Sequence, residues 1–217
     1  MLGRPPVQVL RNGLDLARWR VGLPVNGGAN ERVEGPAHVV SATRFAVRKR
    51  PGALIAMMSR VRAAMAPQQR PTLTILGDGP WLASLQQVVA RSPLSDWVTL
   101  PGRVPRTELL EIYRHADLYV AASRREAFGI AALEARTAGL PIAGYDNSGV
   151  ADIVEPGVGG ILATSDADMV KRLCELLTDR VRLGAMATHH RERPMGAHDW
   201  PSVVRDTLDT YSSIGRP

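Results

Sequence analysis

Cysteine is nearly absent from this chain of 217 residues, which contains only Cys174. A single cysteine excludes an internal disulfide and any metal site built from several cysteines, and it fits a reducing compartment. Long apolar runs are also lacking, because no stretch approaches the roughly 20 apolar residues that cross a bilayer as a helix. The opening residues do not have the charged and then apolar layout of a signal peptide. These absences lead us to expect a cytoplasmic protein.

Aromatic residues are scarce, at 5% of the chain, and no basic run is interleaved with tyrosine or phenylalanine. Proteins that bind single-stranded nucleic acid stack its bases on such side chains, so we expect no nucleic-acid partner. The formal net charge of +6 favours anionic partners in general. Residues 169–193 mix apolar with basic positions, a composition that can lie on an anionic membrane. Packing of that apolar stripe against the protein core is the alternative, and peripheral contact with the inner face of the membrane stays open beside it.

From residue 38 onward, short apolar or β-branched runs alternate with longer segments of helical period. This alternation is typical of strand-and-helix units repeated around a parallel sheet. It predicts an α/β fold, with a single Rossmann-like domain and a doubly wound, parallel, six-stranded sheet. We expect the strands at residues 38–42, 72–76, 97–100, 118–122, 141–143 and 160–162. We expect the helices at residues 51–65, 81–91, 106–115, 128–138, 150–154 and 167–177.

Two flanks fall outside this repeat. Residues 1–36 are rich in glycine, proline and asparagine, and we interpret them as a linker-like segment. The Rossmann-like domain then spans residues 37–195, and the tail from residue 178 predicts terminal helices, the last of them within 196–217. Ligands of such sheets bind outside the carboxyl ends of the strands, so we expect functional residues in the loops there.

A glycine-rich turn, Gly77-Asp78-Gly79-Pro80, follows the second predicted strand and precedes a helix. Glycines at such a place allow backbone N–H groups to approach a phosphate closely. A tight strand-to-helix turn explains the motif better when it is taken alone.

A second turn, Glu126-Ala127-Phe128-Gly129-Ile130, also follows a strand and opens a helix, so the positive helix end points into the crevice. Glu134 lies eight positions beyond Glu126, about 12 Å along the axis if the whole segment is helical. That is the scale of a ribose and a hexose separated by a diphosphate. The two glutamates alone have a simpler explanation. Glu126 could interact with the N-terminal dipole of the helix, and Glu134 could be a solvated residue further along it.

The remaining candidate site residues are basic residues and possible metal ligands. Arg44 and Lys49 follow the first strand, although a basic loop alone is usually just solvated. Asp166-Ala167-Asp168 has the form of a metal-binding D-x-D, but Ser165 before it favours helix capping. We interpret the pairs His189-His190 and Arg124-Arg125 as solvated, and we expect no metal site from His189, His190 and His198.

Taken in order, these motifs make the chain resemble the retaining glycosyltransferases of GT-B fold, specifically the C-terminal, donor-binding domain of glycosyltransferase family 4. The matching segments are R-N-G-L-D at 11–15, Arg44 with Lys49, G-D-G-P at 77–80, L-P-G-R-V at 100–104, Glu126-x7-Glu134, A-G-L-P at 138–141, Ser148-Gly149, and H-D-W at 198–200. The R-N-G-L-D segment resembles the family's inter-domain hinge. Thr43 and Asp152 depart from the family pattern, which commonly has glycine and glutamate there.

The resemblance implies a role for each motif. Arg44 and Lys49 would hold the donor diphosphate and stabilise the negative charge that grows on it. Glu126 would contact the hydroxyls of the donor sugar, and Glu134 those of the ribose. The other implied donor-binding positions are Gly77 and Gly79, then Gly102, Arg103 and Val104 along the base, and Phe128, Gly129 and Ile130, whose backbone N–H groups would bind the phosphates.

The resemblance also implies a hexose transfer from a UDP- or GDP-linked sugar to an acceptor hydroxyl, with retention and without a metal or other cofactor. The departing diphosphate would act as the base, so no enzyme nucleophile is expected. An N-terminal acceptor domain, supplied in cis or in trans, is expected to be missing from this chain, which alone is then incomplete for turnover. Residues 196–217 would form a crossover helix onto that domain and expose apolar residues in its absence.

Two alternatives stay beside this hypothesis. The chain could be a non-catalytic module that binds a nucleotide sugar and needs a separate acceptor-binding partner. The chain could also be an epimerase of sugar nucleotides on a related fold, although the hinge and the A-G-L-P segment are not typical of such epimerases.

Overall fold

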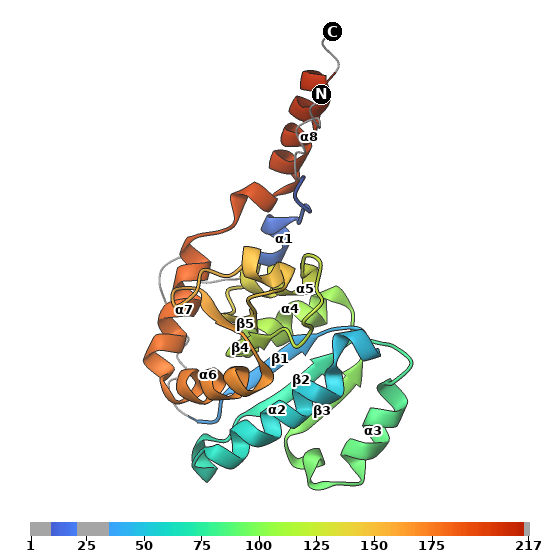
Figure 1. Cartoon of the computed structure of the whole chain (residues 1–217), viewed down its shortest axis with the longest axis vertical. Coiled ribbons are helices and arrows are strands. Elements are labelled where there is room, and N and C mark those ends of the chain that lie inside the picture. Colours follow the sequence, from blue (N-terminus) through green and yellow to red (C-terminus); the bar gives the residue numbers. More distant parts are fainter. Residues whose placement is uncertain (1–9, 21–34, 215–217) are drawn as a thin grey trace, which may run out of the picture.

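The apolar and β-branched runs form one parallel sheet (Figure 1) in a computed structural model that describes residues 10–20 and 35–214. Its strand order is β3-β2-β1-β4-β5-β6, and every neighbouring pair is parallel. The strands are β1 (His38–Ala42), β2 (Thr72–Leu76), β3 (Val98–Gly102), β4 (Leu118–Val120), β5 (Ile142–Tyr145) and β6 (Gly160–Ala163). All six predicted strands are therefore confirmed, with ends shifted by at most a few residues.

Helices cover both faces of this sheet, as the strand-and-helix alternation predicts. They are α1 (Leu16–Arg20), α2 (Pro51–Ala64), α3 (Leu82–Ala90), α4 (Arg106–His115), α5 (Ile130–Thr137), α6 (Asp166–Thr178), α7 (Arg180–Glu192) and α8 (Trp200–Ile214). Five short 3-10 turns lie between them, namely η1 (Val47–Lys49), η2 (Pro67–Gln69), η3 (Pro93–Asp96), η4 (Gly149–Asp152) and η5 (Gly196–His198).

Two hydrophobic cores lie on opposite sides of the sheet. One joins the sheet to α2, α3, α6 and α7, and the other joins it to α1, α4 and α5. The residues of β4 and β5 are all buried, as expected for central strands covered on both faces. The six-stranded, doubly wound α/β sheet predicted from the sequence is thus the fold of the protein.

Two predicted helix assignments need correction. Residues 150–154 form no α-helix, because the segment makes only the short 3-10 turn η4. The helix predicted from residue 128 begins at Ile130, because Gly129 adopts the left-handed conformation, with φ 89°, at its N-cap. Glu126 therefore lies in a loop, and the helical spacing between Glu126 and Glu134 does not apply.

The basic and apolar segment 169–193 packs on the domain. Most of its apolar side chains, among them Met169, Leu173 and Met186, are buried in the core with the sheet, whereas Val181 is 79% exposed. His190 is also buried, at 1% exposure, and its ring contacts the Leu140 carbonyl at 2.7 Å. The prediction that the His189-His190 pair is solvated was therefore wrong for His190, and the His189 side chain is only 13% exposed and lies 3.3 Å from Glu155. Within the described ranges, no helix is both long and apolar enough to cross a bilayer.

The segment that resembles a hinge joins the start of α8. Leu14 donates its backbone N–H to the His198 carbonyl at 2.8 Å, and the His198 ring contacts the Asn12 carbonyl at 3.1 Å. The Trp200 ring packs so closely on Gly13 that an added Cβ would lie 2.4 Å from it. Two motifs at opposite ends of the chain thus form one joint.

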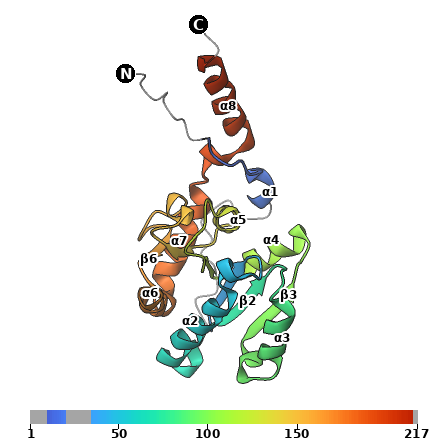
Figure 2. The ribbon, with the colours of Figure 1, turned by 45° about the vertical axis from the view of Figure 1, so that its right-hand side comes forward.

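Helix α8 leaves this joint and projects away from the sheet domain (Figures 1 and 2). Val203 is buried, but Trp200, Val204, Leu208 and Tyr211 are each more than half exposed and follow one another at helical spacing. The expected apolar stripe is therefore present. Of the predicted linker-like segment 1–36, residues 1–9 and 21–34 lie outside the described residues, as do 215–217 of the predicted crossover helix.

Replacing Gly160 by alanine should destabilise the sheet, because the added Cβ would lie 2.0 Å from the Ile142 carbonyl oxygen of β5. We expect the free energy of unfolding, measured in urea, to fall by about 1–3 kcal/mol. The matched control is Gly184→Ala in α7, where no atom lies within 4 Å of the added Cβ. That change should stabilise by roughly 0.5–1 kcal/mol. Equal effects of the two substitutions would contradict the packing of β6 on β5.

Candidate functional site

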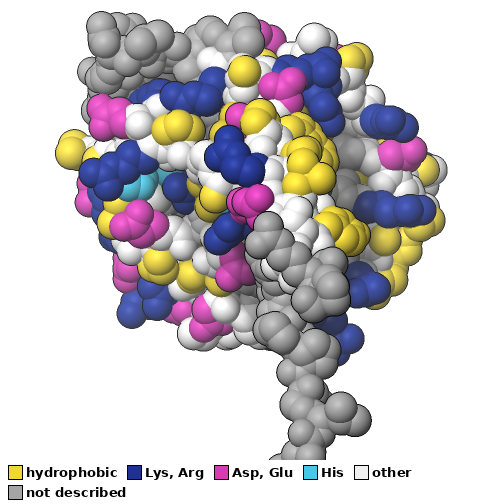
Figure 3. Space-filling model, turned by 90° about the horizontal axis from the view of Figure 1, so that it is seen from above, with side chains coloured by type: hydrophobic (Ala, Val, Ile, Leu, Met, Phe, Trp, Pro, Cys, Tyr) yellow, Lys and Arg dark blue, Asp and Glu magenta, His cyan; other side chains and the backbone are white. Residues whose placement is uncertain are grey.

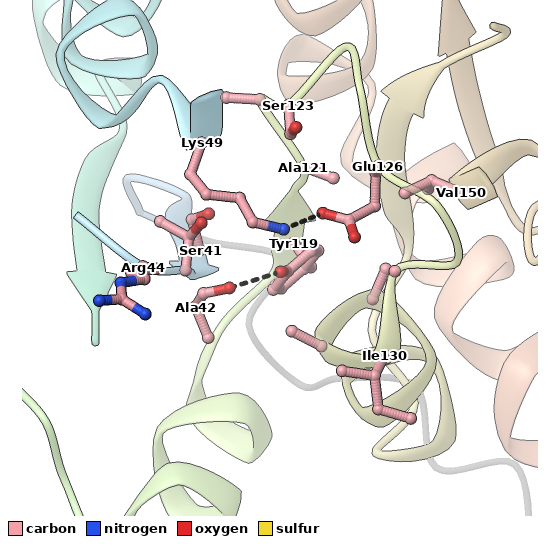
Figure 4. A pocket seen from close by; sticks show the side chains of 15 residues that line it. Ser41, Ala42, Arg44, Lys49, Tyr119, Ala121, Ser123, Glu126, Ile130 and Val150 are labelled. Carbon is pink, nitrogen blue, oxygen red and sulfur yellow. Dashed lines mark hydrogen bonds and ion pairs between the residues drawn. The ribbon is translucent and has the colours of Figure 1, made fainter. Parts of the chain in front are cut away.

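A pocket opens where the strand order reverses, between the carboxyl ends of β1 and β4. Parallel sheets bind ligands at this point because the loops after the two strands diverge to opposite faces. The pocket has a volume of about 220 Å³ and is bounded by the end of β1, η1, the loop after β4, the first turn of α5 and η4 (Figure 4). Its lining includes Ser41, Ala42, Thr43, Arg44, Lys49, Tyr119, Ser123, Glu126, Gly129, Ile130 and Val150.

Lys49 and Glu126 meet across this pocket. The Lys49 amine donates to Glu126 Oε2 at 2.5 Å, although 77 residues separate them in the sequence (Figure 4). Their side chains are 34% and 21% exposed, so solvent screens the pair and its contribution to folding is modest, about 1 kcal/mol or less. The structure thus places two predicted site residues together, with opposite charges facing one cavity.

Arg44 borders the same pocket but points away from the Lys49–Glu126 pair (Figure 4). It also lines a second pocket of about 450 Å³, together with Thr43, Gly77, Asp78, Gly79 and Arg103. Because Thr43 and Arg44 belong to both linings, the two hollows adjoin along the loop after β1. Arg44 therefore lies between two spaces that one elongated ligand could fill.

The two glycines of the G-D-G-P turn let two loops touch. An added Cβ at Gly77 would lie 1.9 Å from the Thr43 carbonyl oxygen, and one at Gly79 would lie 2.5 Å from that of Phe45. The loops also share backbone hydrogen bonds, from Thr43 to Leu76 and from Phe45 to Asp78, both at 2.9 Å. Close backbone packing explains these glycines, and it forms the wall of the second pocket.

The first turn of α5 faces the main pocket. Gly129, as the left-handed N-cap, directs the chain into the helix, and Gly129 and Ile130 line the cavity. The N–H groups of a first helical turn have no intrahelical partner, and with the helix dipole they attract anions. The Phe128 ring instead packs against His198, with 5.4 Å between ring centroids. This contact links the loop before α5 to the base of α8.

Glu134 is set apart from both pockets. Its side chain is only 12% exposed, and Arg106 of α4 lies 3.7 Å away. Burial raises the pKa of Glu134 to about 6, and the positive charge of Arg106 opposes that rise. Neither pocket lining includes Glu134, Gly102 or Val104. A solvated Glu134, the alternative that the sequence left open, is excluded by this burial.

A cluster around Asp166 was not found from the sequence. Arg50 contacts its carboxylate with both terminal nitrogens, at 2.5 and 3.1 Å, and Arg124 contacts it at 3.1 Å. The Tyr145 hydroxyl donates to it at 2.6 Å. Of the pair interpreted as solvated, Arg125 is exposed, whereas Arg124 is 41% exposed and ion-paired with Asp166. The sequence signal for this cluster was the D-x-D itself, whose first aspartate binds two arginine side chains, while Ser165 caps the helix.

The second aspartate of the D-x-D behaves as the sequence predicts. The Ser165 hydroxyl accepts the Asp168 backbone N–H at 3.1 Å, and the Asp168 carboxylate accepts from Thr164 and Arg172. Helix capping is therefore confirmed. Among the residues that the structure describes, no three histidine, cysteine, aspartate or glutamate side chains gather as metal ligands.

Surface charge is mixed at the end of the molecule seen in Figure 3. Lysine and arginine side chains are separated there by acidic and hydrophobic ones. On the described part of this face, the basic groups form no continuous track like those that follow a nucleic-acid backbone. Arg44, Lys49 and Arg103 instead line the two pockets.

A doubly wound parallel sheet with a cation, a carboxylate and a helix N-terminus at its switch point is typical of nucleotide-binding α/β proteins. Residues 28–193 match the model of the family Glycosyl transferases group 1, and the chain belongs to this family.

Similar proteins cover nearly all of this chain. It is 29% identical over 216 residues to a glycogen synthase of Mycobacterium tuberculosis, covering 99% of this chain and 50% of that protein. It is 31% identical over 207 residues to a D-inositol 3-phosphate glycosyltransferase of Thermobispora bispora, covering 90% and 45%. The chain therefore spans about half the length of these relatives.

Solved structures establish the same fold. Anabaena HepE, in a complex with UDP-glucose, aligns with a TM-score of 0.75 and 20% identity over 95% of this chain and 57% of that one. Sucrose-phosphate synthase from Thermosynechococcus elongatus aligns with a TM-score of 0.73 and 23% identity over 95% and 52%. The described sheet is thus one half of a GT-B architecture.

The raised pKa of Glu134 predicts how its ionisation affects stability. The folded pKa of about 6 lies above the ordinary value of 4.5, so folding favours the neutral acid. This contribution is fully present below about pH 4.5 and is lost as the pH rises through 6. Glu134→Gln should therefore stabilise the protein at pH 7.5, by on the order of 1–2 kcal/mol, and change little at pH 4. Urea unfolding at both pH values measures this, with the exposed Glu175→Gln as control; a pH-independent effect of Glu134→Gln would contradict it.

Proposed function

We propose that this chain is the donor-binding half of a retaining glycosyltransferase that needs no metal and moves a hexose from a nucleotide-diphosphate sugar to an acceptor hydroxyl. The observation that supports it best is the meeting of Lys49 with Glu126 in a pocket that also contains the N-terminus of α5. Membership of a glycosyltransferase family provides the reaction class. The pocket then suggests which groups act on which part of the donor.

The diphosphate would lie where positive charge converges. Lys49 reaches into the main pocket, Arg44 lies between the two hollows, and the first turn of α5 contributes backbone N–H groups. Charge develops on the diphosphate as the glycosidic bond breaks, and cations already in place stabilise it with little rearrangement. The Glu126 carboxylate contacts the Lys49 amine at 2.5 Å. We infer that an arriving diphosphate takes over this contact and releases Glu126.

The rest of the donor would extend to both sides of the diphosphate. The released Glu126 would accept hydrogen bonds from hydroxyls of the hexose in the main pocket. The nucleoside would occupy the second pocket, with the base near 102–104 beside Arg103 and the ribose hydroxyls on Glu134. Glu134 lies outside both linings and contacts Arg106 at 3.7 Å, so a ribose bound to Glu134 would exchange or share this contact.

The chemical step would then proceed on one face of the sugar. The bond from the anomeric carbon to the diphosphate oxygen breaks, and the acceptor oxygen bonds to that carbon from the same side. The acceptor proton passes to the departing diphosphate, so charge and atoms balance without an enzyme nucleophile. Metal independence is supported by Asp166 and Asp168, whose carboxylates already bind arginine side chains.

We further propose that a second domain, in cis or in trans, binds the acceptor. The exposed stripe of Trp200, Val204, Leu208 and Tyr211 gives such a domain an apolar surface to cover. Relatives about twice the length of the matched region are consistent with this arrangement. The donor would thus bind to this chain, and transfer would need both halves.

Calorimetric titration tests the donor site. In the presence of EDTA, one of UDP, GDP and ADP should bind with a micromolar to millimolar Kd. Lys49→Ala should weaken that binding roughly 10- to 100-fold, because a charge-assisted contact is lost. The matched control is Lys171→Ala, since Lys171 is the only other lysine and lies exposed on α6. No binding by the unmodified chain would refute the donor-site proposal.

Glu126→Gln should have the opposite effect to Lys49→Ala on the affinity for the nucleoside diphosphate. Removing the carboxylate frees Lys49, so the affinity for the nucleoside diphosphate should rise about two- to fivefold, as expected for a partly exposed ion pair. The additional affinity of the matching nucleotide sugar should disappear, because its hexose loses Glu126. Titrating each variant with both ligands separates the two effects. A parallel loss for both would show that Glu126 only shapes the pocket.

A further inference from the structure

Arg50 has a backbone conformation that side chains other than glycine rarely adopt. Its φ of 57° and ψ of 42° are left-handed, and it alone combines a positive φ with a Cβ in the described part of the chain. The residue ends η1 and begins α2, so it determines the direction in which the chain leaves the turn containing Lys49. Arginine at a place suited to glycine indicates that its side chain is needed.

The Arg50 side chain joins three separate segments. It binds Asp166 at the start of α6 through two nitrogens, and its Nη1 also donates to the Ala122 carbonyl in the loop after β4, at 3.2 Å. Arg124, on that same loop, contacts Asp166 at 3.1 Å and lies over the Tyr145 ring at 5.1 Å. One carboxylate therefore holds two arginines that come from different loops.

These two loops are the ones that contain the proposed diphosphate and sugar contacts. Lys49 directly precedes Arg50, and Glu126 follows Arg124 by two residues. The Ser123 hydroxyl adds a further link by donating to the Arg48 carbonyl at 3.2 Å. The walls of the pocket are thus connected behind the Lys49–Glu126 pair, on the side of α6.

We propose that Asp166 is a positioning residue that, through Arg50 and Arg124, holds the two loops at the separation at which Lys49 and Glu126 face each other. This inference rests on the proposed donor site for its functional consequence, but its structural content can be tested without a ligand. Without the carboxylate, two guanidinium groups are left near one another with no shared counter-ion. They repel each other, the loops separate, and either arginine becomes free to compete with Lys49 for Glu126.

The two lysines of the chain, Lys49 and Lys171, allow a direct measurement. Dimethylation of the amines with carbon-13 formaldehyde gives NMR signals from these two side chains and the N-terminus only. In the protein without substitutions, the Lys49 signal should differ in chemical shift from that of Lys171, which is 75% exposed. Glu126→Gln should identify how much of this difference comes from the ion pair. Asp166→Asn should move the Lys49 signal toward the Lys171 signal. It should also weaken binding of the nucleoside diphosphate identified by titration about tenfold.

Control variants separate positioning from general stability. Asp168→Asn, on the same turn of α6, removes the charge that pairs with Arg172 and keeps the Ser165 cap, so it should leave the Lys49 signal and the affinity unchanged. Arg50→Gly suits the left-handed backbone, so the fold should be retained even if Asp166→Asn unfolds, while the Lys49 signal should move as in Asp166→Asn.

The outcomes decide the two proposals separately. If folded Asp166→Asn and Arg50→Gly proteins keep both the Lys49 signal and the affinity, the positioning role is refuted. If the Lys49 signal moves in Asp166→Asn and Arg50→Gly although no nucleoside diphosphate binds the chain without substitutions, the positioning role holds and the donor-site proposal fails. An equal change in Asp168→Asn would refute a specific role for Asp166.

Discussion

The reversal of strand order between β1 and β4 is the constraint on which the site depends. Right-handed crossovers from parallel strands place successive helices on one face of the sheet, and the winding changes face only where the order reverses. In this chain α2 and α3 connect β1, β2 and β3 on one face, and α4 and α5 lead to β4 and β5 on the other. The loops after β1 and β4 therefore separate, and the pocket lies between them.

Charge balance is organised around three carboxylates at this edge. Glu126 pairs with Lys49, Asp166 with Arg50 and Arg124, and Glu134 with Arg106. Each of these contacts joins different loops or elements, so the carboxylates determine where the cations lie. An incoming anion then exchanges one negative partner for another, which needs less rearrangement than ordering free side chains. In the proposed donor site, a diphosphate would replace a carboxylate as the partner of these cations.

The joint between the two ends of the chain contacts the loop that borders the same site. Asn12 and Leu14 bind His198, and the His198 ring also lies against Phe128, just before the N-cap of α5. The base of the projecting helix α8 is thus in contact with the loop that follows Glu126. A domain that covers the apolar stripe of α8 would be connected to the donor pocket through these few residues.

The sequence by itself determined the sheet, the edge at which ligands bind and the loops that contain Arg44, Lys49 and Glu126. These features follow from local periodicity and from the strong handedness of parallel crossovers, both of which are present in the order of residues. Only the tertiary structure decided which side chains became partners. Asp166 looked like a helix cap, and its contact with Arg50 depends on how α6 packs beside α2. His190 looked exposed, yet Gly159 leaves room for its ring, and an added Cβ there would lie 2.2 Å from Nε2. Such pairings join residues that are distant in sequence, and the packing of whole elements, which no local pattern encodes, brings them together.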